Sequence, residues 1–194
     1  MFRLRRSMLF IPGNNPGMLQ SADVFDSDSV IFDLEDSVSL DEKDAARLLV
    51  REALDNFEYQ AETIIRINPY DSPYYLDDIN MVKDLDINMI LLPKADIESV
   101  NVLAENLKNT DIKIMVLIES AMGVEKVFDI LNASSLCLGL MLGGEDLCLD
   151  LNCVKTKERH ELLYARSRVV NAARALGKFA VDTPFIDPSD EKGL

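Results

Sequence analysis

Residues 29–38, SVIFDLEDSV, join an apolar strand to a cluster of acids. Three apolar residues at 30–32 are followed within four positions by Asp33, Glu35 and Asp36. Carboxylates at the end of a buried strand repel one another and lose hydration, unless a cation lies beside them or the strand end is open to water. The stretch therefore predicts a buried strand whose carboxyl end opens on a polar site.

Similar short apolar runs recur along the chain, and helix-like segments separate them. The runs lie at 7–13, 29–35, 63–68, 89–94, 112–120, 136–146 and 178–185. Strands that are apolar on both faces and alternate with helices are typical of a parallel α/β fold. A closed (β/α)₈ barrel needs eight strands and about 250 residues. We therefore expect residues 1–194 to form a single TIM-type (β/α) barrel domain that is truncated after the seventh strand. It would lack the last β/α unit and the C-terminal helices and be open between the first and seventh strands.

Three segments have the apolar periodicity of helices, at 41–57, 96–109 and 156–177. Asp96 is expected to cap the second helix at its start, with Ser99 in the first turn, and Gly177 to end the third. The i, i+3, i+4, i+8 pattern predicts that the first helix buries a face made of Ala45, Leu48, Leu49 and Ala53.

Composition restricts the classes of function. Apolar residues make up 48% of the chain, and the formal net charge is −14. So acidic a protein is not expected to bind nucleic acid or an anionic membrane, and no apolar run reaches the roughly 18 residues of a membrane helix. Three cysteines without ligand spacing indicate reduced thiols in a cytoplasmic protein. Because there is a single histidine, any metal must be held by oxygen ligands.

Charged residues collect where the predicted strands end, which is where parallel α/β proteins place their sites. These residues are Asp33, Glu35, Asp36, Arg66, Lys94, Glu119, Glu145 and Asp146. Mg²⁺ takes one or two protein carboxylates and leaves its other positions to water and substrate. Glu119 and Asp146, from neighbouring strands, are the expected pair of metal ligands.

The same residues are also compatible with purely structural roles. Each acid, taken singly, could be a helix cap or a first-turn charge in a βα loop. Arg66 stands inside an apolar strand and needs a partner there. It either forms an interior salt bridge with Asp33 or Glu35, or binds a substrate carboxylate through its guanidinium.

Six motifs occur in order along the chain: RRSMLFIPGNN, VIFDLEDSVSLDEKDAARLLV, IIRINP, ILLPK, LIESAMGV and GGEDL. Together they resemble the citrate lyase β/malyl-CoA lyase family, and within it the citrate lyase β branch. The resemblance implies a Mg²⁺-dependent TIM barrel that cleaves a citryl thioester, carried on acyl carrier protein or coenzyme A, to oxaloacetate and an acetyl thioester. It also implies association with other citrate lyase subunits and a homo-oligomer. Malyl-CoA or citramalyl-CoA lyase is the alternative within the family.

The resemblance also assigns roles to particular residues. Glu119 and Asp146 would bind the metal, and Arg66, helped by Glu119, would bind the oxaloacetate end. Asp33 and Glu35 would be the catalytic acids that line the site and position Arg66 and metal-bound water. A carboxylate base suffices for removing the substrate hydroxyl proton where no histidine is available.

Three further hypotheses compete with this one. FDLEDSV also resembles the nucleophile loop of haloacid-dehalogenase phosphatases, with Asp33 as the nucleophile, although Glu35 replaces the second aspartate. Lys94 could form a Schiff base with substrate, although nothing adjacent in the sequence is suited to lowering its pKa. The chain could also be a non-catalytic assembly subunit or an inactive barrel fragment.

Overall fold

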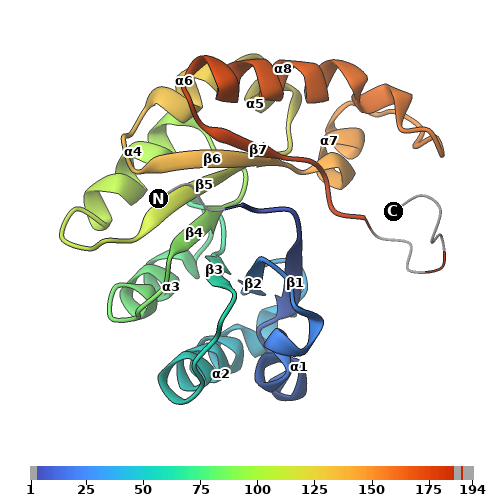
Figure 1. Cartoon of the computed structure of the whole chain (residues 1–194). Coiled ribbons are helices and arrows are strands. Elements are labelled where there is room, and N and C mark those ends of the chain that lie inside the picture. Colours follow the sequence, from blue (N-terminus) through green and yellow to red (C-terminus); the bar gives the residue numbers. More distant parts are fainter. Residues whose placement is uncertain (1–3, 186–188, 190–194) are drawn as a thin grey trace.

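Seven parallel strands form one curled sheet in the computed structural model, which describes residues 4–185 and 189 (Figure 1). The strands are β1 (Met8–Pro12), β2 (Ser29–Asp33), β3 (Glu62–Arg66), β4 (Met89–Leu92), β5 (Lys113–Ile118), β6 (Cys137–Leu142) and β7 (Phe179–Val181). Each strand pairs with the next in the chain, and β1 does not pair with β7 within the described residues. The predicted TIM-type barrel, open between its first and seventh strands, is confirmed.

Helices follow the strands and cover the outside of the curl (Figure 1). They are α1 (Pro16–Gln20), α2 (Lys43–Asn56), α3 (Tyr75–Val82), α4 (Ile97–Asn106), α5 (Ala121–Glu125), α6 (Val127–Asn132), α7 (Gly144–Asp150) and α8 (Leu163–Ala175). Short 3₁₀ turns lie at η1 (Ala22–Phe25), η2 (Leu40–Glu42) and η3 (His160–Leu162). Because all the strands run in parallel, their carboxyl ends lie on the same rim of the sheet.

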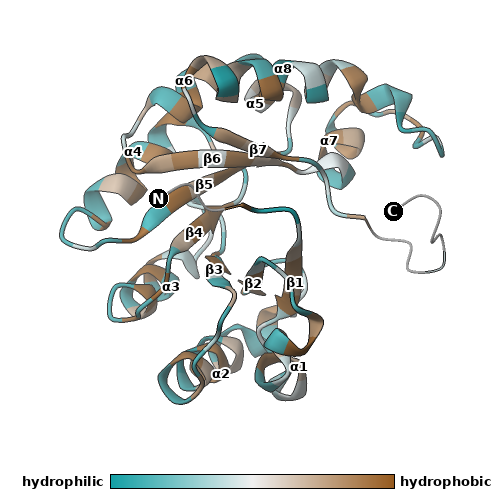
Figure 2. Cartoon of the chain, in the orientation of Figure 1, coloured by the Kyte–Doolittle hydropathy of each residue, from teal (hydrophilic) through white to brown (hydrophobic). Residues whose placement is uncertain are grey.

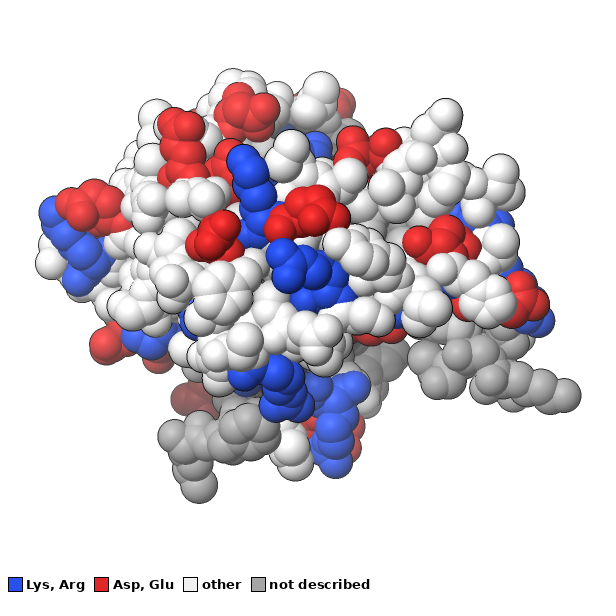
Figure 3. Space-filling model, turned by 90° about the horizontal axis from the view of Figure 1, so that it is seen from above, with Lys and Arg blue, Asp and Glu red and all other residues white. Residues whose placement is uncertain are grey.

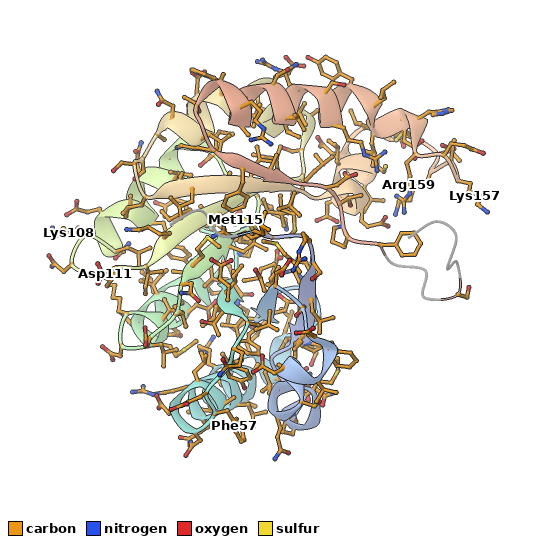
Figure 4. The ribbon with its side chains drawn as sticks, viewed as in Figure 1. Phe57, Lys108, Asp111, Met115, Lys157 and Arg159 are labelled. Carbon is orange, nitrogen blue, oxygen red and sulfur yellow. The ribbon has the colours of Figure 1, made fainter. Side chains whose placement is uncertain are left out.

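Apolar side chains fill both sides of the sheet, which is why the strands are hydrophobic throughout (Figure 2). A larger cluster packs between the sheet and the helices, and a smaller one fills the inside of the curl. Met115 on β5 belongs to the inner cluster, and Figure 4 places it near the centre of the fold. Fully burying an aliphatic side chain contributes about 1.5–3 kcal/mol, so these two layers hold the strand ends in position.

The predicted buried face of α2 is wrong at Ala45 and Leu48, which are both exposed. The helix is rotated so that the buried residues are Lys43, Ala46, Arg47, Val50 and Ala53. The reason is polar: the Lys43 ammonium donates to the backbone carbonyls of Leu34 and Glu35, and Arg47 pairs with a buried aspartate on α3. An apolar periodicity cannot reveal a face that buries two cations.

The predicted ends of the other helices are partly confirmed. Asp96 caps α4 as expected, and Ser99 in the first turn returns a hydrogen bond to the cap residue, while Gly177 adopts a left-handed φ of 67° after α8. However, α8 begins at Leu163, several residues after the predicted start. Thr156 donates both its backbone N–H and its hydroxyl to the side chain of Glu161, which stabilises a turn in place of the first helical residues.

Charges on the surface over α8 and α6 are mixed in sign, as Figure 3 shows from above. Arg168 of α8, for example, donates to the backbone carbonyl of Glu125 at 3.0 Å. In the part of the chain that the structure describes, no helix is long and apolar enough to cross a membrane. The sulfurs of Cys137, Cys148 and Cys153 are free.

Gly139 on β6 provides a test of the packing between the last two strands. A Cβ atom there would lie 2.5 Å from ring atoms of Phe179 on β7, so the ring would have to move. We expect Gly139→Ala to lower the free energy of unfolding by about 1–3 kcal/mol. At the exposed position 17 of helix α1, a Cβ on Gly17 would meet only Asn15 Oδ1, at 3.6 Å. The control Gly17→Ala should leave stability unchanged or raise it by about 0.5–1 kcal/mol. Equal urea midpoints for the two variants would contradict this packing.

Candidate active site

An ion pair between Arg66 and Asp33 joins the carboxyl ends of β2 and β3. The register of the two strands places these residues opposite each other. Arg66 Nε donates to Asp33 Oδ1 and Nη2 to Oδ2, both at 2.6 Å. Asp33 also accepts from the backbone N–H groups of Glu35 and Ser37, at 2.9 and 3.0 Å, and from the Ser37 hydroxyl. Its carboxylate is thus fully engaged in holding the guanidinium and the acidic loop.

The same contacts control the protonation of Asp33. Burial by itself would raise the pKa of this carboxyl, but the hydrogen bonds and charge of Arg66, with help from Ser37, hold the pKa below its ordinary value. Asp33 is only 1% exposed and stays ionised at neutral pH. This geometry suits a residue that positions Arg66 better than one that exchanges protons with a substrate.

One nitrogen of Arg66 remains directed at the site. Nη1 lies 3.1 Å from Glu35 Oε2 and 3.5 Å from Asp36 Oδ2. The ring of Phe10 on β1 lies 5.1 Å from the guanidinium carbon, on which it can act by a cation–π contact. The interior salt bridge that the sequence left open is therefore present, and the remaining edge of the guanidinium faces Glu35 and Asp36 at the site.

Glu35 is a buried carboxyl group whose lost hydration is only partly replaced by hydrogen bonds and nearby cations. It is 5% exposed, and its Oε2 atom accepts no hydrogen bond from the described residues despite its closeness to Arg66. Its other oxygen lies 3.9 Å from Lys94 Nζ. Burial raises the pKa of Glu35 to about 8, and the charges of Asp36 and Glu119 act in the same direction. A carboxyl with a pKa near neutrality can exchange a proton under ordinary conditions.

Glu119 follows β5 and is oriented by the backbone after β4. Its Oε1 accepts the N–H of Lys94 at 2.6 Å. Burial raises the pKa of Glu119 to about 7, and the negative charge of Asp146 raises it further against the effect of that N–H. Gly143 leaves the room that this carboxylate needs, since a Cβ there would lie 2.6 Å from Glu119 Cβ.

Of these groups, Arg66 and Glu119 line a cavity of about 150 Å³ at the carboxyl ends of the strands. Its lining comprises Phe10, Asp36, Arg66, Leu117, Glu119, Met141, Gly143, Gly144, Glu145, Asp146, Thr183 and Pro184. The two carboxylates expected to bind metal, Glu119 and Asp146, therefore face the same small space. Two oxygen donors that repel each other beside a cavity suit a small hard cation such as Mg²⁺. The described residues contain no cluster of three or more ligand-type side chains, so water and substrate would complete the shell of a bound ion.

Glu145 is neutralised by contacts away from the metal pair. Its carboxylate pairs with Lys155 and with Arg159, whose Nη1 lies 2.9 Å from Oε1. These hydrogen bonds lower the pKa of Glu145, those from Lys155 contributing most. Arg159 stands on the segment between α7 and α8, as Figure 4 shows. Of the two neighbouring acids at the end of β6, Asp146 is the one left without such a partner among the described residues.

Sequence reasoning missed several parts of the site. Gly143 could have been found from the GG pair before Glu145, because glycine allows close approach of neighbouring groups. Thr183 could not, since its hydroxyl accepts the N–H of Gly144 at 3.0 Å across a separation of 39 residues. The hydrogen bond from the backbone N–H of Lys94 to Glu119 was also missed, because the pattern of side chains in a sequence does not show where a backbone N–H points.

A barrel-type sheet that gathers an arginine and several carboxylates at the carboxyl ends of its strands is the arrangement of a TIM-barrel-type enzyme. The chain belongs to the family described as HpcH/HpaI aldolase/citrate lyase, which matches residues 6–194.

Relatives and solved structures agree with this family. The chain is 43% identical to the citrate lyase subunit beta of Leuconostoc mesenteroides subsp. cremoris, over 99% of this chain and 67% of that protein. It is 31% identical to the L-malyl-CoA/beta-methylmalyl-CoA lyase of Rhodobacter capsulatus, over 99% of this chain and 70% of that protein. The citrate lyase beta subunit from M. tuberculosis, solved with oxaloacetate and magnesium, superposes with a TM-score of 0.82. It is 27% identical, and the match covers 99% of this chain and 85% of that one.

The phosphatase hypothesis is wrong on these findings. The strands follow one another in the order β1 to β7, without the reversal of order that defines a doubly wound sheet. Asp33 cannot act as an exposed nucleophile, because it is buried and both its oxygens hold Arg66. The family match independently places the chain among lyases and aldolases.

The raised pKa values of Glu35 and Glu119 predict how stability depends on pH. Both carboxyls bind a proton more tightly in the folded state, because their pKa values rise from 4.5 to about 8 and about 7. The resulting stability is complete below about pH 4 and is lost as the pH rises through about 7 to 8. In EDTA, we expect the melting temperature to fall as the pH is raised from about 5.5 to 8.5, and Glu35→Gln to reduce that fall.

The exposed residue Glu58 provides a matched control for this measurement. Glu58→Gln removes the same charge and should keep the wild-type dependence. Few other groups titrate in this range, since the chain has one histidine. The prediction would be contradicted by a melting temperature that is the same at both pH values. It would also be contradicted if the melting temperature of Glu35→Gln fell as much as that of the wild type, because the buried carboxyls would then not be the cause of the pH dependence.

Proposed function

We propose that this chain is a Mg²⁺-dependent carbon–carbon lyase that cleaves a citryl thioester to oxaloacetate and an acetyl thioester. The observation that carries the proposal is the shared cavity, where one edge of Arg66 and the carboxylates of Glu119 and Asp146 meet. An anionic 2-oxo acid requires a cationic surface, which this protein of net charge −14 offers there through Arg66 and a bound metal. The similarity to citrate lyase beta subunits supports the choice of substrate.

The side chains have distinct roles in the proposed reaction. Arg66 binds a carboxylate of the substrate through its remaining edge, while Asp33 fixes the plane of the guanidinium. Glu119 and Asp146 would hold Mg²⁺, which when bound lowers the pKa of the substrate hydroxyl and stabilises charge on the developing carbonyl. Glu35 accepts the hydroxyl proton, for which its raised pKa is suited.

The proposed cleavage needs no oxidant or reductant. As the hydroxyl proton leaves, the C–O⁻ electron pair forms the carbonyl of oxaloacetate and the adjacent C–C bond breaks. The electrons of that bond pass to the methylene of the acetyl thioester as an enolate, which a proton then converts to the methyl group. A Schiff base on Lys94 is not needed for this chemistry.

The proposal extends to partners and location. The thioester would be carried on acyl carrier protein or coenzyme A, and the chain would associate with other citrate lyase subunits and with copies of itself in the cytoplasm. The second candidate is a malyl-CoA or citramalyl-CoA lyase, because a malyl-CoA lyase is 31% identical over 99% of this chain. Assays with citryl-, malyl- and citramalyl-CoA, each with and without Mg²⁺, distinguish the two. No turnover of any of them would favour an assembly subunit or an inactive barrel fragment.

Removing either proposed metal ligand should weaken Mg²⁺ binding. We expect Glu119→Gln and Asp146→Asn each to reduce Mg²⁺ affinity in calorimetry by at least about ten-fold, because a site with two carboxylates loses half of its charged donors. The matched control is Glu145→Gln, whose carboxylate is occupied by Lys155 and Arg159 and should affect the affinity by less than about two-fold. If all three variants bind Mg²⁺ like the wild type, the assignment of the ligands is wrong.

Arg66 allows the substrate-binding role to be separated from a purely structural one. Arg66→Lys keeps the charge but loses the planar fork that Asp33 holds, so we expect at least a roughly ten-fold loss of activity. Asp33→Asn should also lower activity, because the guanidinium loses the charged partner that orients it. The measurement is the melting temperature beside turnover, with and without oxaloacetate. Should oxaloacetate stabilise Arg66→Lys as much as the wild type, Arg66 serves only the fold.

A further inference from the structure

Thr183, on the segment that follows β7, reaches the active-site cavity. It lines the same space of about 150 Å³ as Arg66, Glu119 and Asp146. The other polar side chains in the described wall of this cavity are charged, and Thr183 is the only lining residue that carries a hydroxyl. It therefore supplies the one uncharged side-chain donor among the described residues that line the cavity.

Contacts on two sides fix the position of this hydroxyl. Its Oγ1 accepts the N–H of Gly144 at 3.0 Å. A Cβ on Gly144 would lie 2.7 Å from that oxygen, so glycine is what allows the two groups to approach. The backbone N–H of Thr183 donates to Asp182 Oδ1 at 2.8 Å, and Asp182 pairs with Arg166 of α8. The hydroxyl is thus held beside the start of α7, the helix that carries Asp146.

The fold uses the acceptor side of this hydroxyl and leaves its proton unused. A threonine hydroxyl has one O–H donor and two acceptor lone pairs. Oγ1 accepts from Gly144, and no described residue accepts the proton that Oγ1 itself carries. The residue is only partly buried. A ligand in the cavity can therefore take this hydrogen bond.

The order of the strands places Thr183 across the metal pair from Arg66. Arg66 lies on β3, Glu119 and Asp146 follow β5 and β6, and Thr183 follows β7. A substrate whose carboxylate is bound by Arg66 and whose hydroxyl meets the metal directs another arm toward Thr183. Arg66 is the only cation in the described wall of the cavity, so the opposite side offers no positive side chain to a second carboxylate. A neutral thioester needs none, and it is the arm that suits this side.

We propose that Thr183 is a further catalytic residue, whose hydroxyl donates a hydrogen bond to the thioester oxygen as the C–C bond breaks. This inference rests on the proposed lyase function and assigns one more role within the same site.

The hydrogen bond strengthens where the reaction creates charge. The electrons of the broken bond pass through the methylene carbon to the thioester oxygen, which becomes the oxygen of the enolate. A donor that is already aimed at this oxygen stabilises the transition state more than the bound substrate. The hydroxyl keeps its proton on Oγ1, and the enolate later takes its proton on the methylene carbon, so the balance of the cleavage is unchanged.

The test removes the O–H and keeps the shape of the side chain. We expect Thr183→Val to lower kcat for citryl-CoA by at least about ten-fold. The exchange of the methyl protons of acetyl-CoA with D₂O, followed by NMR in the presence of Mg²⁺ and oxaloacetate, should slow by a similar factor because it requires the enolate. Calorimetric affinities for Mg²⁺ and for oxaloacetate should change by less than about two-fold, since neither ligand takes this hydrogen bond. Thr183→Ser, which keeps the hydroxyl, should recover most of both rates.

Thr110 provides a matched control at the opposite end of the sheet. It precedes β5, and its Oγ1 also accepts a backbone N–H, that of Ile112 at 3.3 Å. Thr110→Val should change kcat and the exchange rate by less than about two-fold, because this hydroxyl lies outside the cavity.

Two results would overturn the inference and leave the lyase function intact. One is an unchanged exchange rate in Thr183→Val. The other is a loss of Mg²⁺ affinity as large as the loss of kcat, because Thr183 would then act only through Gly144 and the position of α7. If the wild type neither cleaves citryl-CoA nor binds oxaloacetate, the proposed function and this inference both fail.

Discussion

The ion pair between Asp33 and Arg66 is the constraint on which the rest of the site depends. A guanidinium at the end of an apolar strand is unfavourable unless a carboxylate meets it with good geometry, and removing one partner of such a pair is strongly destabilising. The parallel register of β2 and β3 places the two residues side by side, and two hydrogen bonds of 2.6 Å join them. The plane of the guanidinium is therefore set before any ligand arrives.

The carboxylates around this pair differ in how many hydrogen-bond donors and cations surround them, and this difference separates their roles. Asp33 is saturated by donors and its pKa is held low, whereas the pKa of Glu35 is raised to about 8 and that of Glu119 to about 7. Groups with perturbed pKa values in a cleft are candidates for chemistry, and saturated ones hold the structure. One acidic motif thus supplies both a positioning residue and a candidate base.

The second layer of the structure supports the acidic loop from behind. Lys43 on α2 donates to the carbonyls of Leu34 and Glu35, and Arg47 on the same helix pairs with Asp78, which also accepts from Asn68. Buried polar groups of this kind are tolerated because each finds a partner. The helix is consequently rotated toward the sheet by its charged residues, and Leu48 remains in solvent.

The sequence alone determined the parallel α/β fold, the seven strands and the strand ends at which the charged residues gather. These follow from local properties: apolar runs of strand length, helical periodicity between them, and the rule that parallel strands share a carboxyl rim. Tertiary structure alone decided which acid pairs with which base. It assigned Asp33 to Arg66, turned Glu145 toward Lys155 and Arg159, and directed the N–H of Lys94 to Glu119. Such choices depend on distances between distant segments and on burial, because the energy of a charge is set by all of its neighbours in space and by the water it has lost.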